Sequence, residues 1–328
     1  MAHIGLTGAA ILTVENGVTV TFENGTGDGV SDILELDDTA SAINYGSLVF
    51  DNDDMFRCID LEDESEFENF GSIVMNGRDS LSIGIQTDDD TPFTNHIGAT
   101  LEINDTDFIS IQHDGPFVND GIITIDQFGF IGIQLNAFNP AETVVHQNNG
   151  ILTIRNDVAG ANEYLDIRND NEFRNSGIVN IQGSVEVAAF QFSGSDVSLL
   201  NNQECGIINL EAPAFFDLEE AAALLLNVGV IASAYSGNHL NEGTITNNGR
   251  IQTPTGLFNF SGAGAFGGTG SVVVGEVPTM EPLLSTCPQV TGAPPVPAAT
   301  PVPLVPLWLL GIMAGLLSLV GVRNLRKV

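Results

Sequence analysis

Lysine is almost absent from this 328-residue chain, whose single lysine is Lys327 at the C-terminal end. The first 303 residues carry six arginines against 42 aspartates and glutamates. A field of that sign repels the phosphates of nucleic acids and anionic lipids, so we expect no nucleic-acid partner. The acidic side chains are either a solubilising surface or ligands for cations, and charge alone does not name the ligand.

Cysteine and histidine are scarce as well. Cys58, Cys205 and Cys287 have none of the short spacings of zinc or redox motifs, and they fit one disulfide with a spare thiol in any pairing. The five histidines share no ligand spacing, so we expect each on the surface or in a loop. These patterns argue against zinc and thiol-exchange chemistry.

A recognisable catalytic motif is also missing. No arrangement of serine, histidine and aspartate can be assigned, and Arg155, Arg168 and Arg174 are the only local basic cluster of the body. Gly262 to Gly267 match the G-x-G-x-x-G fingerprint of dinucleotide-binding proteins, but the sequence predicts no helix after them and no βαβ unit around them. We therefore expect a protein that is not an enzyme.

The chain is rich instead in one repeated phrase: an apolar residue, then Asn-x-Gly, then apolar residues at every second position. Copies contain Asn44, Asn69, Asn119, Asn148, Asn175, Asn227 and Asn241, and degraded copies surround Gly98 and Gly206. From Gly46 to Gly229 the glycines recur every 23 to 29 residues. A fixed period of this size, built from strands, is typical of a solenoid.

Second alternating segments, such as residues 81–86 and 130–134, lie between these glycines and indicate two short strands per period. The glycine is expected to supply a positive φ at the corner, and the asparagine to bond its local backbone or the asparagine of the next turn. We predict an all-β protein, a right-handed parallel β-helix, with a β-sandwich as the alternative. Residues 218–226 (LEEAAALLL) depart from the pattern and have helical propensity, which indicates a short insertion or a capping helix.

The longest apolar run lies near the C-terminus. Residues 303–322 are uncharged, and Arg323, Arg326 and Lys327 follow them. About 20 apolar residues match the hydrocarbon thickness of a bilayer, and cations beyond them favour leaving that end in the cytoplasm. We expect a transmembrane helix at 303–322, a basic cytoplasmic tail at 323–328, and the rest of the chain outside the membrane.

This C-terminal arrangement resembles the sorting signals of bacterial surface proteins of the PEP-CTERM and IPTL-CTERM class. The short proline-containing motif corresponds to residues 302–308 (VPLVPLW), ahead of the apolar run and basic tail. The glycine-punctuated stretch at 260–274 is similar to strand repeats of bacterial autotransporters and adhesins. The resemblance implies an exported protein that a sorting protease or transpeptidase recognises.

These observations divide the chain into five segments. We expect N-terminal strands or a cap at 1–40, β-helix repeats at 41–275, a proline-rich linker at 276–302, the transmembrane segment at 303–322 and the tail at 323–328. Met1 to Gly17 lacks the basic n-region of a signal peptide, so either a leader is missing from this sequence, which we favour, or the protein is inserted by its tail.

Residues 24–35 have the spacing of a calcium-binding loop. Its ligands would be the side chains of Asn24, Thr26, Asp28, Asp32 and Glu35 and the carbonyl of Val30. The alternative is a glycine-rich hairpin turn between two strands. Further acidic clusters, Asp51 with Asp53 and Asp54, and Asp88 with Asp89 and Asp90, are either calcium ligands along one edge of the rod or solvated turns.

Taken together, the sequence predicts an exported cell-surface protein, anchored in the membrane at least transiently, whose role is structural or adhesive. Surface glycans are the expected contact, with Ca²⁺ as an assisting ion. The alternative is a polysaccharide hydrolase or lyase, because parallel β-helices also resemble pectate lyases and polygalacturonases. A groove with carboxylates converging from consecutive turns would favour the enzyme.

Overall fold

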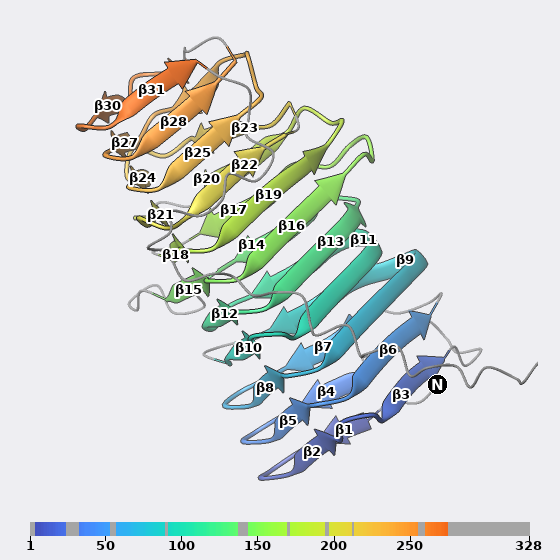
Figure 1. Cartoon of the computed structure of the whole chain (residues 1–328). Helices are drawn as coiled ribbons and strands as arrows, with labels where there is room; N and C mark the ends of the chain where they lie inside the picture. Colours follow the sequence, from blue (N-terminus) through green and yellow to red (C-terminus); the bar gives the residue numbers. More distant parts are fainter. Residues whose placement is uncertain are drawn as a thin grey trace, which may run out of the picture. The chain divides into compact units, whose positions relative to one another are not determined.

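The computed structural model describes residues 4–23, 33–52, 57–88, 91–136, 144–168, 171–193, 197–211, 213–254 and 260–274. These residues form the strands β1 to β31, and none of them lies in a helix. The strands pair in parallel and stack along one axis (Figure 1). The parallel pairing confirms the predicted β-solenoid and excludes the β-sandwich alternative, whose sheets are antiparallel.

Each turn of the solenoid contributes one strand to each of three ladders. The first ladder runs β1 (Ile4–Leu6), β4 (Leu34–Leu36), β7 (Arg57–Leu61), the second half of β9 (Ser72–Thr87), the second half of β11 (Thr100–His113), β14 (Ile131–Leu135), β17 (Glu163–Arg168), β20 (Ala188–Ser193), β23 (Phe215–Leu218), β26 (His239–Asn241) and β29 (Phe260–Ser261).

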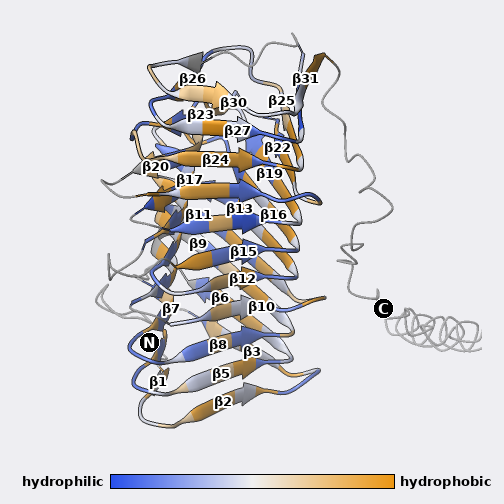
Figure 2. Cartoon of the chain, turned by 90° about the vertical axis from the view of Figure 1, so that its left-hand side faces the viewer, coloured by the Kyte–Doolittle hydropathy of each residue, from blue (hydrophilic) through white to orange (hydrophobic). Residues whose placement is uncertain are grey.

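The second ladder is a separate sheet of 11 strands (Figure 2). It runs β2 (Ile11–Val14), β5 (Ser41–Asn44), β8 (Glu66–Asn69), β10 (Phe93–Asn95), β12 (Phe117–Asn119), β15 (Val145–Asn148), β18 (Glu172–Asn175), β21 (Leu199–Asn202), β24 (Leu224–Asn227), β27 (Thr244–Asn247) and β30 (Ala265–Gly267).

The third ladder runs β3 (Thr19–Glu23), β6 (Ser47–Asn52), the first halves of β9 and β11, β13 (Ile122–Phe128), β16 (Ile151–Asn156), β19 (Ile178–Gly183), β22 (Ile207–Leu210), β25 (Val230–Ser233), β28 (Arg250–Thr253) and β31 (Ser271–Val274). The sequence predicted two strands per period. The additional strand is the short one that ends at the repeated asparagine, in the second ladder.

The expected helix at 218–226 is wrong. Those residues end β23, make a turn and begin β24. Ala223 and Leu225 are buried, and Leu225 pairs in register with Leu200 of the preceding turn. Burial against the neighbouring turn therefore overrides the helical propensity of the alanines and leucines.

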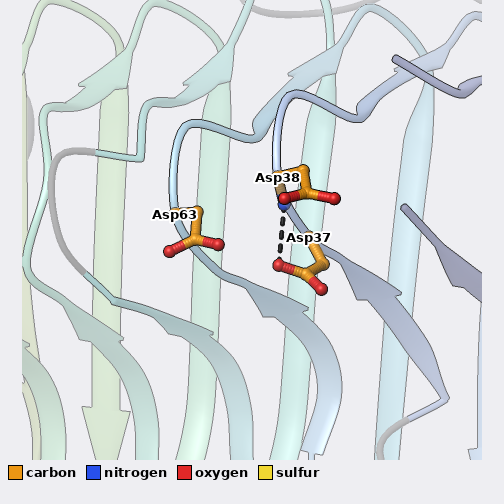
Figure 3. A group of neighbouring side chains, drawn as sticks. All are labelled: Asp37, Asp38 and Asp63. Carbon is orange, nitrogen blue, oxygen red and sulfur yellow. Dashed lines mark hydrogen bonds between the residues drawn. The ribbon is translucent and has the colours of Figure 1, made fainter. Parts of the chain in front are cut away.

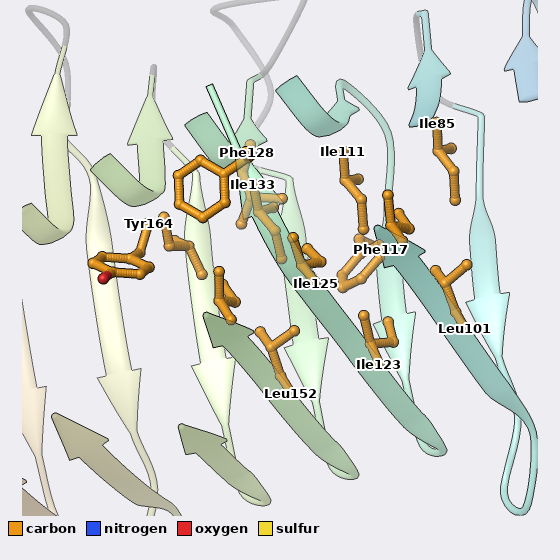
Figure 4. Packing of buried hydrophobic residues seen from close by; sticks show 14 of the residues in the cluster. Ile85, Leu101, Ile111, Phe117, Ile123, Ile125, Phe128, Ile133, Leu152 and Tyr164 are labelled. Atoms are coloured by element: carbon orange, nitrogen blue, oxygen red, sulfur yellow. The ribbon is translucent and has the colours of Figure 1, made fainter. Parts of the chain in front are cut away.

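The core is a set of columns of inward-facing side chains, each column repeating one position of the turn (Figure 4). Ile123 and Ile125 of β13 point inward, as the alternation predicted, and both are fully buried. In the second ladder, Phe67, Phe93 and Phe117 stack with ring centroids 5.6 and 5.9 Å apart. Aromatic stacking of this kind adds to the area buried between turns.

A continuous ladder of buried asparagines lies at the corner between the second and third ladders. Its members are Asn44, Asn69, Asn95, Asn119, Asn148, Asn175, Asn202, Asn227 and Asn247. Each amide nitrogen, from Asn44 to Asn227, donates to the amide oxygen of the next member, over 2.7 to 2.9 Å. The same nitrogens donate to a main-chain carbonyl of the next turn, for example Ile178 O from Asn148 at 3.1 Å. This confirms the predicted asparagine stacking.

One predicted copy of the phrase occupies a different corner. Asn241 ends β26 and Gly243 lies between β26 and β27, whereas the ladder continues through Asn247. The phrase Asn247-Asn248-Gly249 is the true equivalent and was missed, because the two copies are six residues apart and only the pairing of β27 with β24 distinguishes them.

The predicted reason for the corner glycines is also wrong. Gly46, Gly121 and Gly150 do not have a positive φ; of the periodic glycines, Gly98 does. Except at Gly98, each of these corners is instead too close to the turn before it for a side chain. A Cβ on Gly150 would lie 2.0 Å from the carbonyl oxygen of Gly121. Glycine is required here because backbone stacks on backbone.

Candidate functional site

The residue that follows each ladder asparagine points away from the core, and these residues form a row along the corner, which we call the corner row. At its N-terminal end the row is aromatic. The Tyr45 and Phe70 rings stack with centroids 5.0 Å apart, and Phe70 stacks on the His96 ring at 3.8 Å. Tyr45 is 44% and Phe70 38% exposed. Farther along, the row is mostly polar, with Asn149 bonded to Asp120 and Ser176, and it includes the exposed apolar residue Val228.

An open pocket of about 470 Å³ adjoins this aromatic strip and is lined by Glu15, Asn16, Tyr45 and Phe70. An aromatic surface beside a carboxylate and a carboxamide offers an apolar platform with hydrogen-bonding groups at its rim. That combination suits a neutral sugar ring, which has an apolar face and polar hydroxyls. The sequence contained a signal for the strip that was overlooked: Tyr45 and Phe70 each occupy the middle position of the repeated Asn-x-Gly phrase, and the solenoid stacks equivalent positions.

A second feature is a group of three carboxylates from neighbouring turns (Figure 3). Oxygens of Asp37, Asp38 and Asp63 lie within 4.8 Å of one another. Asp38 and Asp63 both have a positive φ, at 59° and 55°, and occupy equivalent turns after β4 and β7. The Asp38 amide donates to Asp37 Oδ1 over 2.7 Å. Oxygen ligands of this type suit Ca²⁺. Asp38 and Asp63 are 25 residues apart, which is one repeat period, so their spacing in the sequence indicates that the two side chains lie on neighbouring turns.

The predicted calcium loop falls mostly outside the described residues: of its six ligands, Asn24, Thr26, Asp28, Val30 and Asp32 lie there. Glu35 lies in β4, opposite Asp60 of β7. The hairpin alternative is wrong, because β3 pairs with β6 and β4 pairs with β1 and β7, all in parallel. Of the other acidic clusters, Asp51 lies in β6 of the third ladder and Asp88 follows β9 in the first. The structure does not describe Asp53, Asp54, Asp89 or Asp90.

Carboxylates on the first ladder bear on the enzymatic alternative. Burial, with Asp166 nearby, raises the pKa of Glu163 to about 7. Burial, with Glu219 nearby, raises the pKa of Asp217 to about 6. Asp166 and Asp217 share a column, but Gln191 lies between them. Two strand spacings, roughly 10 Å, therefore separate the two carboxylates, which do not come from consecutive turns.

The predicted arginine cluster is not a cluster in space. Arg155, Arg168 and Arg174 lie in β16, β17 and β18, which belong to three different ladders. Each is neutralised by a nearby carboxylate: Asp157 at 2.9 Å for Arg155, Asp166 for Arg168, and Glu172 at 2.6 Å for Arg174. They do not form a common site for an anionic substrate.

Three histidines contradict the expected surface placement: His113, His146 and His239 are buried. His146 occupies the phenylalanine column, opposite Phe173, and its ring lies 6.2 Å from that of His113. Burial lowers the pKa of His146 to about 3 and that of His113 well below its usual value. Both imidazoles are therefore neutral core groups at physiological pH.

The cysteines take two states. Cys58 is a buried free thiol whose pKa is raised by burial. Cys205 is disulfide-bonded. Cys287 lies outside the described residues. Cys58 packs in the core, and because a thiol with a raised pKa is a poor nucleophile, its role there is structural.

The apolar run at 303–322 also lies outside the described residues, among which no helix is long and apolar enough to cross a bilayer. Comparison with known proteins found no matching protein family, no matching curated protein and no matching solved structure.

Proposed function

We propose that this protein is an exported, cell-surface structural and adhesive rod, sorted or anchored through its C-terminus. The proposed body is a right-handed β-solenoid, the proposed anchor a transmembrane helix at 303–322, and the proposed processing partner a sorting protease or transpeptidase. The feature that supports adhesion best is the exposed aromatic strip of Tyr45, Phe70 and His96 with its adjoining pocket. The apolar run with its basic tail supports surface attachment.

Neutral glycans are the proposed contact of the aromatic strip. The chain has a formal net charge of −33, which disfavours polyanionic sugars unless cations bridge the two. The Asp37, Asp38 and Asp63 carboxylates are the proposed Ca²⁺ ligands for such bridging. The charge and the rings together favour uncharged polysaccharides as the direct ligands.

Native gels containing neutral polysaccharides, with the full chain in mild detergent, test this contact. We expect laminarin, mannan or dextran in the gel to retard the wild-type chain, and Tyr45→Ala and Phe70→Ala to lose at least about tenfold in apparent affinity, since stacked aromatic contacts contribute strongly to binding. Val228→Ala is the matched control, because Val228 is an exposed apolar residue elsewhere in the corner row. Equal retardation of all variants, or none for the wild type, would contradict the adhesive role.

The mass of the mature protein from its native source tests surface sorting. We expect loss of the residues after about Pro303, because a processed sorting signal is cleaved near its proline-containing motif. An intact chain ending at Val328 would mean an unprocessed anchor and would remove the sorting-signal hypothesis, while leaving the glycan contact open to its own test.

A polysaccharide hydrolase or lyase is the second candidate. The observation in its favour is the raised pKa of Glu163, a property of catalytic acids. The arrangement around Glu163 argues against the enzyme, because Asp166 and Asp217 come from turns that are not consecutive and the arginines are dispersed. Release of reducing ends from a polyuronate by the wild-type chain and not by Glu163→Gln would favour this candidate over the rod.

A further inference from the structure

The corners between the second and third ladders differ in length. Two residues connect the strands after β5, β8, β12, β15, β18, β24 and β27, whereas four connect them after β2, β10 and β21, at 15–18, 96–99 and 203–206. Each four-residue corner is closed as a β-turn, for example by the bond from Ala99 N to His96 O at 2.9 Å. Figure 2 shows the corners after β2 and β10 projecting beyond those between them. Tyr45 and Phe70 lie on the two short corners between these projecting turns.

Both projecting turns carry an exposed apolar residue. Val18 is 45% exposed and Ile97 is 74% exposed, so neither side chain is needed to fill the core. Together with the aromatic strip they gather the exposed apolar groups of four successive turns at one corner, and such a gathering marks an interaction surface. We call this surface the corner niche: its floor is Tyr45 and Phe70, and its two walls are the turns at 15–18 and 96–99. The walls are three strand spacings apart, roughly 14 Å.

Hydroxyl groups line the third-ladder side of the niche. One residue from each of the first four turns carries a hydroxyl in the same outward column: Thr19, Ser47, Ser72 and Thr100. None of these four residues is buried. In the next four turns the column is isoleucine: Ile122, Ile151, Ile178 and Ile207. Because serine and threonine hydroxyls both donate and accept hydrogen bonds, this side of the niche can bond to the hydroxyls of a sugar.

The second-ladder side of the niche is polar as well. Glu68 lies in β8, just before the corner, and its carboxylate oxygen is 3.2 Å from His96 Nε2. Glu15 and Asn16 line the pocket beside the aromatic rings. The carboxylates repel anionic sugars and can accept hydrogen bonds from neutral ones. Hydrogen-bonding groups therefore flank the aromatic floor on both sides, whereas the projecting turns close its two ends.

The walls decide the direction in which a polymer can pass over the floor. A chain that followed the solenoid axis would meet the turn at 15–18 or the turn at 96–99. A chain that crossed the corner from the second ladder to the third would pass Glu68, the two rings and then the hydroxyls of Ser47 and Ser72, with both of its ends free. The crossing path is therefore the one open to a long polysaccharide.

We propose that the corner niche binds an internal segment of an unbranched neutral polysaccharide, which crosses the corner from the second ladder to the third. Tyr45 and Phe70 contact the C–H groups of the sugars, Ser72 bonds to their hydroxyls, and Ile97 contacts the side of the chain. A branch at the bound segment would meet a wall. This inference rests on the proposed glycan contact and adds to it the form of the polysaccharide and the residues that select it.

Variants of the wall and of the hydroxyl column test these contacts. The full chain in mild detergent is bound to beads coated with dextran or laminarin, whose chains are largely unbranched. Ile97→Asn removes an exposed apolar contact and should weaken binding at least about fivefold. Ser72→Ile places in the niche the residue that the same column carries in later turns, and the lost hydrogen bond should weaken binding at least about threefold.

Each variant has a matched control outside the niche. Val158→Asn makes the same kind of change at an exposed apolar residue of another corner, and Ile151→Ser makes the reverse exchange in the same column. Both controls should bind like the wild type, and all four variants should keep its β-sheet circular dichroism. If Ile97→Asn and Ser72→Ile bind as well as the wild type while Tyr45→Ala does not, this inference is overturned and the glycan contact stands.

The wild type alone tests the crossing path. Soluble dextran and laminarin are divided into size fractions, and each fraction is supplied at equal mass concentration to release the bound protein from the beads. Recognition of internal segments predicts equal release by all fractions, because equal masses hold equal numbers of such segments. Release in proportion to the number of chain ends would overturn the proposal. A wild type that binds neither polysaccharide would contradict both this inference and the adhesive role.

Discussion

Asn148→Ala is expected to destabilise the solenoid by about 3–5 kcal/mol. The substitution removes the acceptor of Asn119 Nδ2 at 2.7 Å and the donor to Asn175 Oδ1 at 2.8 Å and to Ile178 O at 3.1 Å. Each buried polar group left without its partner costs about 1–3 kcal/mol, and the truncated side chain leaves a void in a fully buried position. Unfolding in guanidinium chloride, followed by circular dichroism, measures the loss.

Asn149→Ala is the matched control for that experiment. Asn149 is the next residue, but its side chain is exposed and bonds to Asp120 and Ser176 at the surface. We expect its effect to stay within about 0.5 kcal/mol. Equal losses for Asn148→Ala and Asn149→Ala would mean that the buried asparagine ladder contributes no more to stability than the surface bonds beside it.

Gly150→Ala is expected to cost about 3 kcal/mol or more, or to prevent folding of the neighbouring turns. The new Cβ would lie 2.0 Å from Gly121 O and 2.8 Å from the carbonyl carbon of Asp120, both of them main-chain atoms that cannot rotate away. Relief requires the two turns to separate at the corner, which would lengthen the hydrogen bond from Ile151 N to Gly121 O. The shift of the thermal unfolding midpoint measures the effect.

Gly267→Ala provides the comparison. Gly267 does not have a positive φ, and an added Cβ there would meet no heavy atom within 4 Å. Its replacement should leave the midpoint nearly unchanged or raise it slightly, because alanine restricts the unfolded chain. If both glycine variants behaved alike, close backbone approach would not be the reason for glycine at the corners.

Much of the fold could be read from the repeated phrase. The recurrence of Asn-x-Gly with alternating apolar residues predicted a parallel solenoid and asparagine stacking, and both are confirmed. The errors share one cause. The six-residue offset between Asn241 and Asn247, the helix-like residues 218–226 and the buried His146 are each decided by the register with the neighbouring turn, which no local pattern contains.

The candidate site was less accessible to sequence reasoning. Tyr45, Phe70 and His96 are 25 and 26 residues apart, and what they share is a position in the repeat, directly after the asparagine, and not a known binding motif. They form a strip because the corners stack at strand spacing, which places the residue after each asparagine directly over its equivalent. The three arginines show the converse. Arg155, Arg168 and Arg174 are close in the sequence, but consecutive strands of a turn belong to different ladders, so the solenoid separates them.

By itself, the sequence determined the solenoid class, the acidic body, the asparagine stack and the apolar run with its basic tail, because period and composition act locally along the chain. The tertiary structure alone decided the role of the corner glycines, the burial of three histidines and the aromatic strip. Each of these depends on which residues of one turn lie over those of the next, and that contact is fixed by the register of the whole stack.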